Sequence, residues 1–346
     1  MGREDRDARR SSEEDEDEDE EDEDEEEMSG RDSAILLARD VAIAVILVLA
    51  ILGAIFAYTQ VWPPMVVVES ASMQHSDTQS YLGVIDTGDL VLVQRAPEKA
   101  DVVTWAEGKA SGYRTYGDFG DVIVFHPQGY SLDSTPIIHR PIVYAIWNEN
   151  HGGWDVPALE NPALAGLWQA TNETGVPLTL PRAITGSLVL HQMGFQGTLT
   201  LTIPFKELNT SVANHVDGYV TKGDHNSPFD AWGIVPQSRV VGKARGELPW
   251  FGLLKLLVSP GTKCCPSWGY VSWDHQGATK NAWDSLTLTL VLIPIGLYLA
   301  DAAYAFGEDQ WKWWKRSRGK RRGARGGPEK GVPEQGPGPP GPGGQT

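Results

Sequence analysis

One hydroxyl side chain stands where it could act on other polypeptides at a membrane surface. Ser72 follows the apolar stretch 41–58 by about 14 residues, and this stretch of 18 residues is long enough to cross a bilayer. Because an extended chain covers at most about 3.5 Å per residue, Ser72 is tethered close to that membrane. A nucleophile in this position suits a protease that cuts beside the ends of other hydrophobic segments.

Peptide hydrolysis requires a nucleophilic hydroxyl, a base that takes its proton, and donors for the oxyanion that forms. Ser72, His139 and Asp230 can supply the nucleophile, the base and an orienting carboxylate. Taken alone, a serine usually lies in a turn or on the surface, and a histidine after an apolar pair such as Ile137-Ile138 is usually packed in the core. The histidines without a comparable context are expected to be structural or exposed: His126, His151, His191, His215 and His275.

Ser72 belongs to the first of five short blocks that follow one another along the chain. The blocks are 66–73, 87–93, 120–125, 137–140 and 221–226, the last followed by Asp230. This ordered set resembles the type I signal peptidase family over roughly residues 60–245. A histidine at position 139, where bacterial members carry lysine, resembles the archaeal and endoplasmic-reticulum branch. One departure is that Gln74-His75 follows Met73, where many members have a proline two residues after the methionine.

The resemblance implies a role for each site residue. Ser72 matches the nucleophile and His139 its base, and Ser70 matches the position that donates a hydroxyl to the oxyanion beside the backbone N–H of Ser72. Ser70 could instead make only a strand-end hydrogen bond. Asp230 lies six residues after Asp224, at the spacing of the triad acid in this branch, and we favour it for that role. Asp224 remains a second candidate, which could otherwise brace its turn through backbone N–H groups.

The region between the two long apolar stretches predicts one sizeable, mainly β domain with a signal-peptidase-like fold. Eight runs rich in Val, Ile and aromatic residues are separated by Gly, Pro and Asp. The expected strands are 65–68, 89–94, 121–125, 142–147, 187–190, 198–203, 218–221 and 239–243. The stretch 148–214 has few landmarks of the family and is expected to be an inserted lobe. Residues 248–258 are expected either to lie in the membrane interface or to form a packed terminal helix.

The second apolar stretch, 286–306, is about as long as a membrane span, although it contains Pro294 and Asp301. We expect a second transmembrane helix there, and the alternative is a helix that lies against the domain. Basic residues precede the first stretch and crowd behind the second, so both termini are expected in the cytoplasm and the catalytic region outside the cell membrane. The first stretch is too long for a cleavable signal peptide, and no clear cleavage site follows it.

Both ends of the chain are expected to be disordered tails of opposite charge. Residues 1–30 hold 18 Asp or Glu against 4 Arg, whereas residues 312–346 hold 9 Lys or Arg against 2 acids. Without these tails, the net charge of −17 becomes −10 for residues 31–311. Nucleic acid is therefore not an expected partner, and an acidic folded surface fits a haloarchaeal-like protein. The expected parts are 1–33 (tail), 34–59 (span), 60–283 (catalytic domain), 284–306 (span) and 307–346 (tail).

The only cysteines are the adjacent pair Cys264-Cys265. Adjacent cysteines rarely form a disulfide with each other, and this pair lacks the spacing of a zinc site. No metal or other cofactor is therefore expected.

These features together predict a membrane-bound serine endopeptidase that removes signal peptides from exported preproteins, after small residues and through an acyl-enzyme. Its expected partners are such preproteins and the lipid bilayer, with the secretion translocon as a further candidate. The alternative is a membrane-anchored, non-catalytic β-domain that binds exported or envelope proteins. A membrane serine protease with regulatory substrates is a further alternative that only substrate profiling distinguishes.

Overall fold

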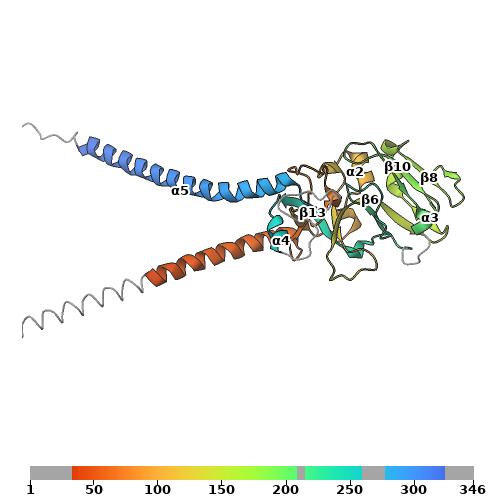
Figure 1. Cartoon of the computed structure of the whole chain (residues 1–346), viewed down its shortest axis with the longest axis horizontal. Coiled ribbons are helices and arrows are strands. Elements are labelled where there is room, and N and C mark those ends of the chain that lie inside the picture. The colour runs from red at the N-terminus through yellow and green to blue at the C-terminus, as the bar shows by residue number, and fades with distance from the viewer. Residues whose placement is uncertain (1–32, 209–214, 259–276, 324–346) are drawn as a thin grey trace, which may run out of the picture. The chain divides into compact units, whose positions relative to one another are not determined.

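The computed structural model describes residues 33–208, 215–258 and 277–323 (Figure 1). Its contacts divide the chain into two units, Met1–Leu286 and Thr287–Thr346. All the strands belong to the first unit, and the second holds most of the long helix α5, Lys280–Gly323. Residues 1–32 and 324–346 of the two charged tails and the pair Cys264-Cys265 lie outside the described residues. Residues 307–323 were expected to belong to the disordered C-terminal tail, but they continue helix α5.

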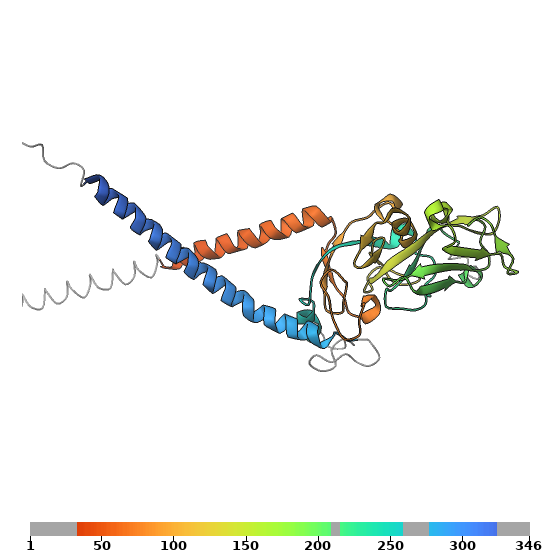
Figure 2. The same cartoon turned by 90° about the horizontal axis from the view of Figure 1, so that it is seen from above.

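Two helices are long and apolar enough to cross a membrane. One covers Ser33–Thr59, and the other is the part Lys280–Lys312 of α5, which continues without interruption through Pro294 (blue in Figure 2). Most large apolar side chains along both helices are exposed on the protein surface. The prediction that both apolar stretches form helices is confirmed, and their exposed apolar surface is suited to lipid.

An antiparallel sheet of seven strands carries the candidate site. Its strands run in the order β1-β2-β13-β5-β6-β12, and β7 pairs with β6 beside this path. The bounds are β1 Met65–Val67, β2 Leu90–Gln94, β5 Ile123–Phe125, β6 Ile137–Asn148, β7 Gly153–Asp155, β12 Gly218–Lys222 and β13 Val240–Leu248. Strand β6 is held from both sides, because His139 pairs with Ile123 of β5 and Arg140 pairs with Lys222 of β12.

The expected inserted lobe forms a second antiparallel sheet within the same unit. Its strand order is β11-β10-β8-β9, with β8 Trp168–Thr171, β9 Pro177–Leu178, β10 Leu188–Met193 and β11 Leu199–Ile203 (Figure 1). Short helices accompany it: η3 Pro157–Glu160, η4 Pro162–Leu164 and α3 Phe205–Leu208. Trp154 and Phe205 of the lobe share one buried apolar cluster with Ile142 of β6 and with Trp105. A continuous core therefore packs the lobe against the seven-stranded sheet.

Helix α2, Trp105–Ser111, and the hairpin of β3, Arg114–Thr115, and β4, Asp118–Phe119, precede β5. Thr104 and Glu107 form a capping box at the start of α2. Gly120 follows the hairpin with a φ of 78°, and a Cβ at this position would lie 2.6 Å from the carbonyl carbon of Thr104. Only glycine fits this turn, which brings the end of the hairpin close to the start of α2. The remaining short helices are η1 Ala71–Met73, η2 Lys99–Asp101, η6 Gln237–Arg239 and α4 Leu253–Val258.

Each of the eight expected strands is found, although β6 begins five residues before its expected start at 142 and β13 ends five residues after its expected end at 243. Helix α2 was not predicted from the sequence, nor were the short strands β3, β4, β7, β8 and β9; they lie in segments rich in glycine, proline and polar residues. The expectation of a mainly β chain is not confirmed. The chain is mixed, with 36% helix and 25% strand, because the two long helices outweigh the strands of the folded domain.

Helix α4 occupies the end of the segment 248–258. Its Leu253 and Leu256 are buried in a cluster with Trp283, whereas Leu257 and Val258 are exposed. The prediction of a packed terminal helix is therefore confirmed for one face of α4. Its insertion into a membrane interface stays a prediction that concerns the other face.

Candidate active site

The candidate nucleophile lies in a tight turn that is separated from the end of strand β1 by three residues. Ser70 is still extended, with φ −141° and ψ 161°, and the 3-10 turn η1 covers the next three residues. Ala71 and Met73 are buried on either side of Ser72, and they anchor the turn while the serine remains partly exposed. Apolar residues on both sides of the serine thus direct its hydroxyl away from the core.

His139 lies in β6 and links the serine to one of the two candidate aspartates. Its Nε2 is 2.9 Å from Ser72 Oγ, and its Nδ1 is 2.5 Å from Asp230 Oδ2. The carboxylate oxygen of Asp230 accepts a hydrogen bond from Nδ1–H, which leaves Nε2 unprotonated and able to accept a hydrogen bond from the serine hydroxyl. His139 is 4% exposed and Asp230 is 6% exposed, so the chain of hydrogen bonds is largely shielded from water.

Asp230 is held in place by strand β12. Its Oδ2 also accepts a hydrogen bond from Thr221 Oγ1 at 2.8 Å, and its backbone N–H donates to the carbonyl of Thr221 at 2.9 Å. Thr221 therefore fixes both the backbone and the carboxylate of the aspartate. This role of Thr221 was not predicted from the sequence.

Gly223 lets the loop after β12 approach both the serine and the histidine. A Cβ at this position would lie 2.5 Å from the backbone oxygen of Ser72 and 2.9 Å from His139 Nε2. The loop is tied to the nucleophile turn by a hydrogen bond of 2.9 Å from the backbone N–H of His225 to the same oxygen of Ser72. A glycine is therefore required for the close approach rather than for an unusual backbone angle.

Ser70 also lies at the site. Its Oγ is 3.2 Å from the Oγ of Ser72, a distance at which one hydroxyl can donate to the other. A hydroxyl beside the nucleophile is placed to donate to an oxygen that develops negative charge there. The alternative expected for Ser70, a strand-end hydrogen bond, is not among the contacts of its side chain in the described residues.

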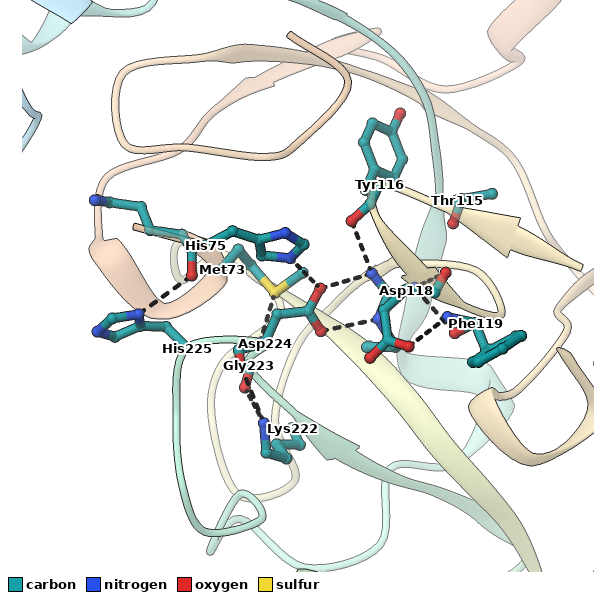
Figure 3. Close-up of polar contacts among 12 residues, drawn as sticks. Met73, His75, Thr115, Tyr116, Asp118, Phe119, Lys222, Gly223, Asp224 and His225 are labelled. Carbon is teal, nitrogen blue, oxygen red and sulfur yellow. Dashed lines mark hydrogen bonds and ion pairs between the residues drawn. The ribbon is translucent and has the colours of Figure 1, made fainter. Parts of the chain in front are cut away.

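Asp224 does not contact His139. Its carboxylate binds the guanidinium of Arg140, with 2.8 Å to Nε and 2.6 Å to Nη2, and it lies 3.3 Å from Nε2 of His75 (Figure 3). Burial raises the pKa of Asp224, but the charge of Arg140 and the hydrogen bonds from Arg140 and His75 together outweigh burial and hold this pKa well below its usual range. A brace on backbone N–H groups was the other role considered for Asp224, but the contacts of its carboxylate in the described residues are with the side chains of Arg140 and His75.

Arg140 is fully buried beside the candidate base. Its Nη1 donates to the carbonyl oxygens of Phe119 and Gly120, both at 3.1 Å, and its Nη2 lies 3.4 Å from that of Tyr116. The arginine thus joins β6 to the hairpin that precedes β5. The sequence held one signal for this role, namely that Arg140 directly follows His139 within an apolar strand. A charged residue buried in a strand needs a partner of opposite charge or a hydrogen-bond acceptor.

Lys222 is a second buried cation beside the site. Its Nζ donates to the backbone oxygens of Gly223 and Asp224 at 2.8 and 3.3 Å (Figure 3). Burial lowers the pKa of Lys222. These hydrogen bonds support the loop that approaches Ser72. Because the ammonium of Lys222 is used in them, Lys222 is not a candidate for the base that activates Ser72.

An apolar cluster lies behind the nucleophile turn. Val68 precedes the two serines, Met73 follows them, and Ile138 neighbours His139; all three belong to or pack against the same buried cluster, with Ile85, Val91, Val122 and Ala244. Among the residues described, no group of three or more His, Cys, Asp or Glu side chains is arranged to hold a metal ion.

The histidines set aside in the sequence analysis lie elsewhere. The ring of His215 stacks on Trp147, and His191 contacts Thr200 within the lobe. His126 and His151 lie outside the contacts of the candidate site, and His275 is not among the described residues. Comparison of the chain with protein-family models, with curated proteins and with solved structures yields no match, so the geometry of Ser72, His139 and Asp230 is the basis for a functional assignment.

Proposed function

We propose that this protein is a membrane-bound serine endopeptidase of the signal peptidase type, which removes signal peptides from exported preproteins. One observation carries the proposal: Ser72 Oγ lies 2.9 Å from His139 Nε2, and His139 Nδ1 lies 2.5 Å from the buried Asp230. A hydroxyl, an imidazole and a carboxylate hydrogen-bonded in this order form the catalytic triad of a serine hydrolase.

In the proposed reaction, His139 Nε2 takes the hydroxyl proton as Ser72 Oγ attacks the scissile carbonyl carbon. Asp230 stabilises the resulting imidazolium without taking its proton. The oxyanion is stabilised by the Ser70 hydroxyl and the backbone N–H of Ser72. The C–N bond then breaks as the imidazolium protonates the leaving amine, and a water molecule activated by His139 hydrolyses the acyl-enzyme.

The substrate is an extended segment that adds to the sheet beside β1, which ends the strand order of the seven-stranded sheet. Main-chain hydrogen bonds at such an edge bind many sequences, as a processing enzyme with diverse substrates requires. Shallow apolar pockets beside this edge would select small side chains near the cut. This chemistry fits the small residues one and three positions before a signal peptide cleavage site.

Membrane anchoring supports the same proposal. The helices Ser33–Thr59 and Lys280–Lys312 can both cross a bilayer, and the candidate nucleophile follows the end of the first of them by 13 residues. In the proposed topology both tails are cytoplasmic and the domain is outside, where signal peptides emerge. Preproteins and the bilayer are then its partners, and the secretion translocon is a candidate.

The test is cleavage of a preprotein by the purified protein in lipid vesicles, with the cut position read by mass spectrometry. Ser72→Ala should abolish cleavage, by a factor on the order of 10⁴ or more, and leave expression and membrane insertion unchanged. The matched control is Ser111→Ala, at an exposed serine of α2. Cleavage by Ser72→Ala at the rate of the control variant would end the serine-protease proposal.

A protein that binds preproteins in the same assay without cutting them would instead support the non-catalytic alternative. The intact hydrogen-bonded chain from Ser72 to Asp230 disfavours that alternative, because mere binding requires no buried imidazole paired to a carboxylate.

A further inference from the structure

The Asp224 carboxylate is a junction of three segments that carry the candidate triad. It binds Arg140, which directly follows His139 in β6, and it lies 3.3 Å from Nε2 of His75, three residues after Ser72. Asp224 itself belongs to the loop that leads to Asp230. One carboxylate thus ties together the nucleophile turn, the strand of the base and the loop of the acid.

His75 is in turn held by the inserted lobe. Its ring stacks on the ring of Phe195, with centroids 4.2 Å apart and planes at 11°. Phe195 lies in the turn between β10 and β11, after a β-bulge in their pairing. On another side, Gly117 leaves room for the histidine, since a Cβ there would lie 2.5 Å from Cε1 of His75. The side chain of His75 is only 8% exposed.

We propose that His75 and Phe195 are positioning residues for catalysis, through which the inserted lobe holds the Asp224 junction and hence the alignment of Ser72 with His139. The lobe is then part of the active-site scaffold rather than a separate binding module. This inference rests on the proposed serine-protease function and assigns to the lobe a role in it.

The physical reason is rotational freedom. The outer torsion of a histidine side chain is broad, so the backbone alone does not aim Nε2 at Asp224. Stacking on Phe195 fixes the plane of the imidazole, and a fixed plane keeps its nitrogen directed at the carboxylate. Because small misplacements of catalytic groups lower the rate much more than they weaken binding, the effect should fall on kcat.

The first experiment compares Phe195→Ala, Phe195→Tyr and the control Leu180→Ala, at another exposed apolar residue of the lobe, in the full-length protein in lipid. Phe195→Ala should lower kcat for preprotein cleavage at least fivefold with less than a twofold change in KM. Phe195→Tyr, which keeps the ring, should restore kcat to within twofold of the wild type. Equal kcat values for Phe195→Ala and Leu180→Ala would overturn the inference, and a change in KM alone would show that Phe195 contacts substrate instead.

The second experiment separates the two contacts of His75. His75→Phe keeps a ring that can stack on Phe195 but loses the nitrogen that faces Asp224, whereas His75→Gln keeps a donor without the stacked ring. Both should lower kcat, and combining His75→Gln with Phe195→Ala should add less than twofold, because the stack is already lost. Fully multiplicative effects would show that the two residues act independently and would contradict the proposal.

A readout without substrate distinguishes failure of this inference from failure of the proposed function. In a Ser72→Cys protein that also carries Cys264→Ser and Cys265→Ser, the rate at which iodoacetamide alkylates the introduced thiol reports on its proximity to His139, since an adjacent histidine favours the thiolate. Adding Phe195→Ala should lower this rate at least threefold at neutral pH, and adding Leu180→Ala should not. An unchanged alkylation rate overturns the inference, whatever the cleavage assay shows, whereas a wild-type protein that cleaves no preprotein overturns only the proposed function.

Discussion

Two aspartates in one loop have different partners, and this difference separates two kinds of role. Asp230 hydrogen-bonds to the imidazole of His139, whereas Asp224 neutralises Arg140. A carboxylate that is hydrogen-bonded to the catalytic histidine determines which ring nitrogen carries the proton. A carboxylate that pairs with a buried guanidinium contributes to the stability of the fold. We therefore expect Asp230→Asn to lower mainly kcat and Asp224→Asn to lower mainly the free energy of unfolding.

Asp230→Asn should keep the fold but lower kcat by a factor on the order of 10⁴, with a smaller change in KM, because an amide favours the wrong tautomer of His139. Steady-state cleavage of a preprotein in vesicles measures both constants. The control is Asp217→Asn, at an aspartate that accepts a hydrogen bond from the backbone of Trp147 away from the site. Normal turnover by Asp230→Asn would remove this residue from the triad.

Asp224→Asn should act mainly through stability and cost about 3–5 kcal/mol, because it removes the carboxylate that pairs with the buried Arg140. A brace on backbone N–H groups would have cost only about 0.5–2 kcal/mol. The folded-state pKa of Asp224 lies below its unfolded value, so its stabilising contribution is present at neutral pH and is lost only as the pH falls through the folded pKa in strong acid. Urea unfolding at pH 7 measures the difference, and a variant as stable as the wild type but fully inactive would place Asp224 in the chemistry.

At the scale of elements, the block 87–93 contributes a buried turn rather than a catalytic group. Asp89, at the start of β2, accepts hydrogen bonds from the backbone N–H groups of Trp250 and Asp86, at 2.9 and 2.7 Å. Gly88 has a φ of 96° and lies against Leu253 of α4. The turn therefore holds β2 and α4 together.

Burial raises the pKa of Asp89 from 3.8 to about 8, so the folded protein keeps a proton that the unfolded chain releases. The stability contributed by this group should then decline as the pH rises from about 4 towards 8. Asp89→Asn should make that decline shallower, even if it lowers stability overall by replacing one acceptor oxygen with an amide. Thermal midpoints at several pH values test this, with Asp133→Asn in an exposed loop as control. An equally steep decline in both variants would contradict the assignment.

At the scale of the whole molecule, the two apolar helices and the charges around them predict a topology. Protease added to intact cells should reach only the segment between the two spans and should spare epitopes on residues 1–30 and 324–346, because basic residues flank the cytoplasmic ends of both spans. Immunoblotting with a tag at each terminus measures this, and permeabilised cells are the control. Removal of the N-terminal tag from outside would show that the orientation is inverted.

The sequence by itself determined the local features of this protein. Runs of apolar residues long enough for a span form the two long helices, and alternating β-branched runs form the eight expected strands. It also named Ser72, His139 and both aspartates as candidates, since these residues stand in short blocks of recognisable order. Such features depend on neighbours along the chain, and they can be read without knowing which strands pair.

Only the tertiary structure decided which of these residues meet. A register shift between Val220 and Thr221 in the pairing of β12 with β6 determines the alignment of Thr221, and hence of Asp230, relative to His139. A shift of one residue in a strand moves every side chain to the opposite face, and no local pattern in the sequence specifies a bulge. For the same reason the contacts of Arg140 and His75 with Asp224, and of Phe195 with His75, were not predicted: they join residues far apart in sequence, whose distance depends on how sheets, turns and lobe pack together.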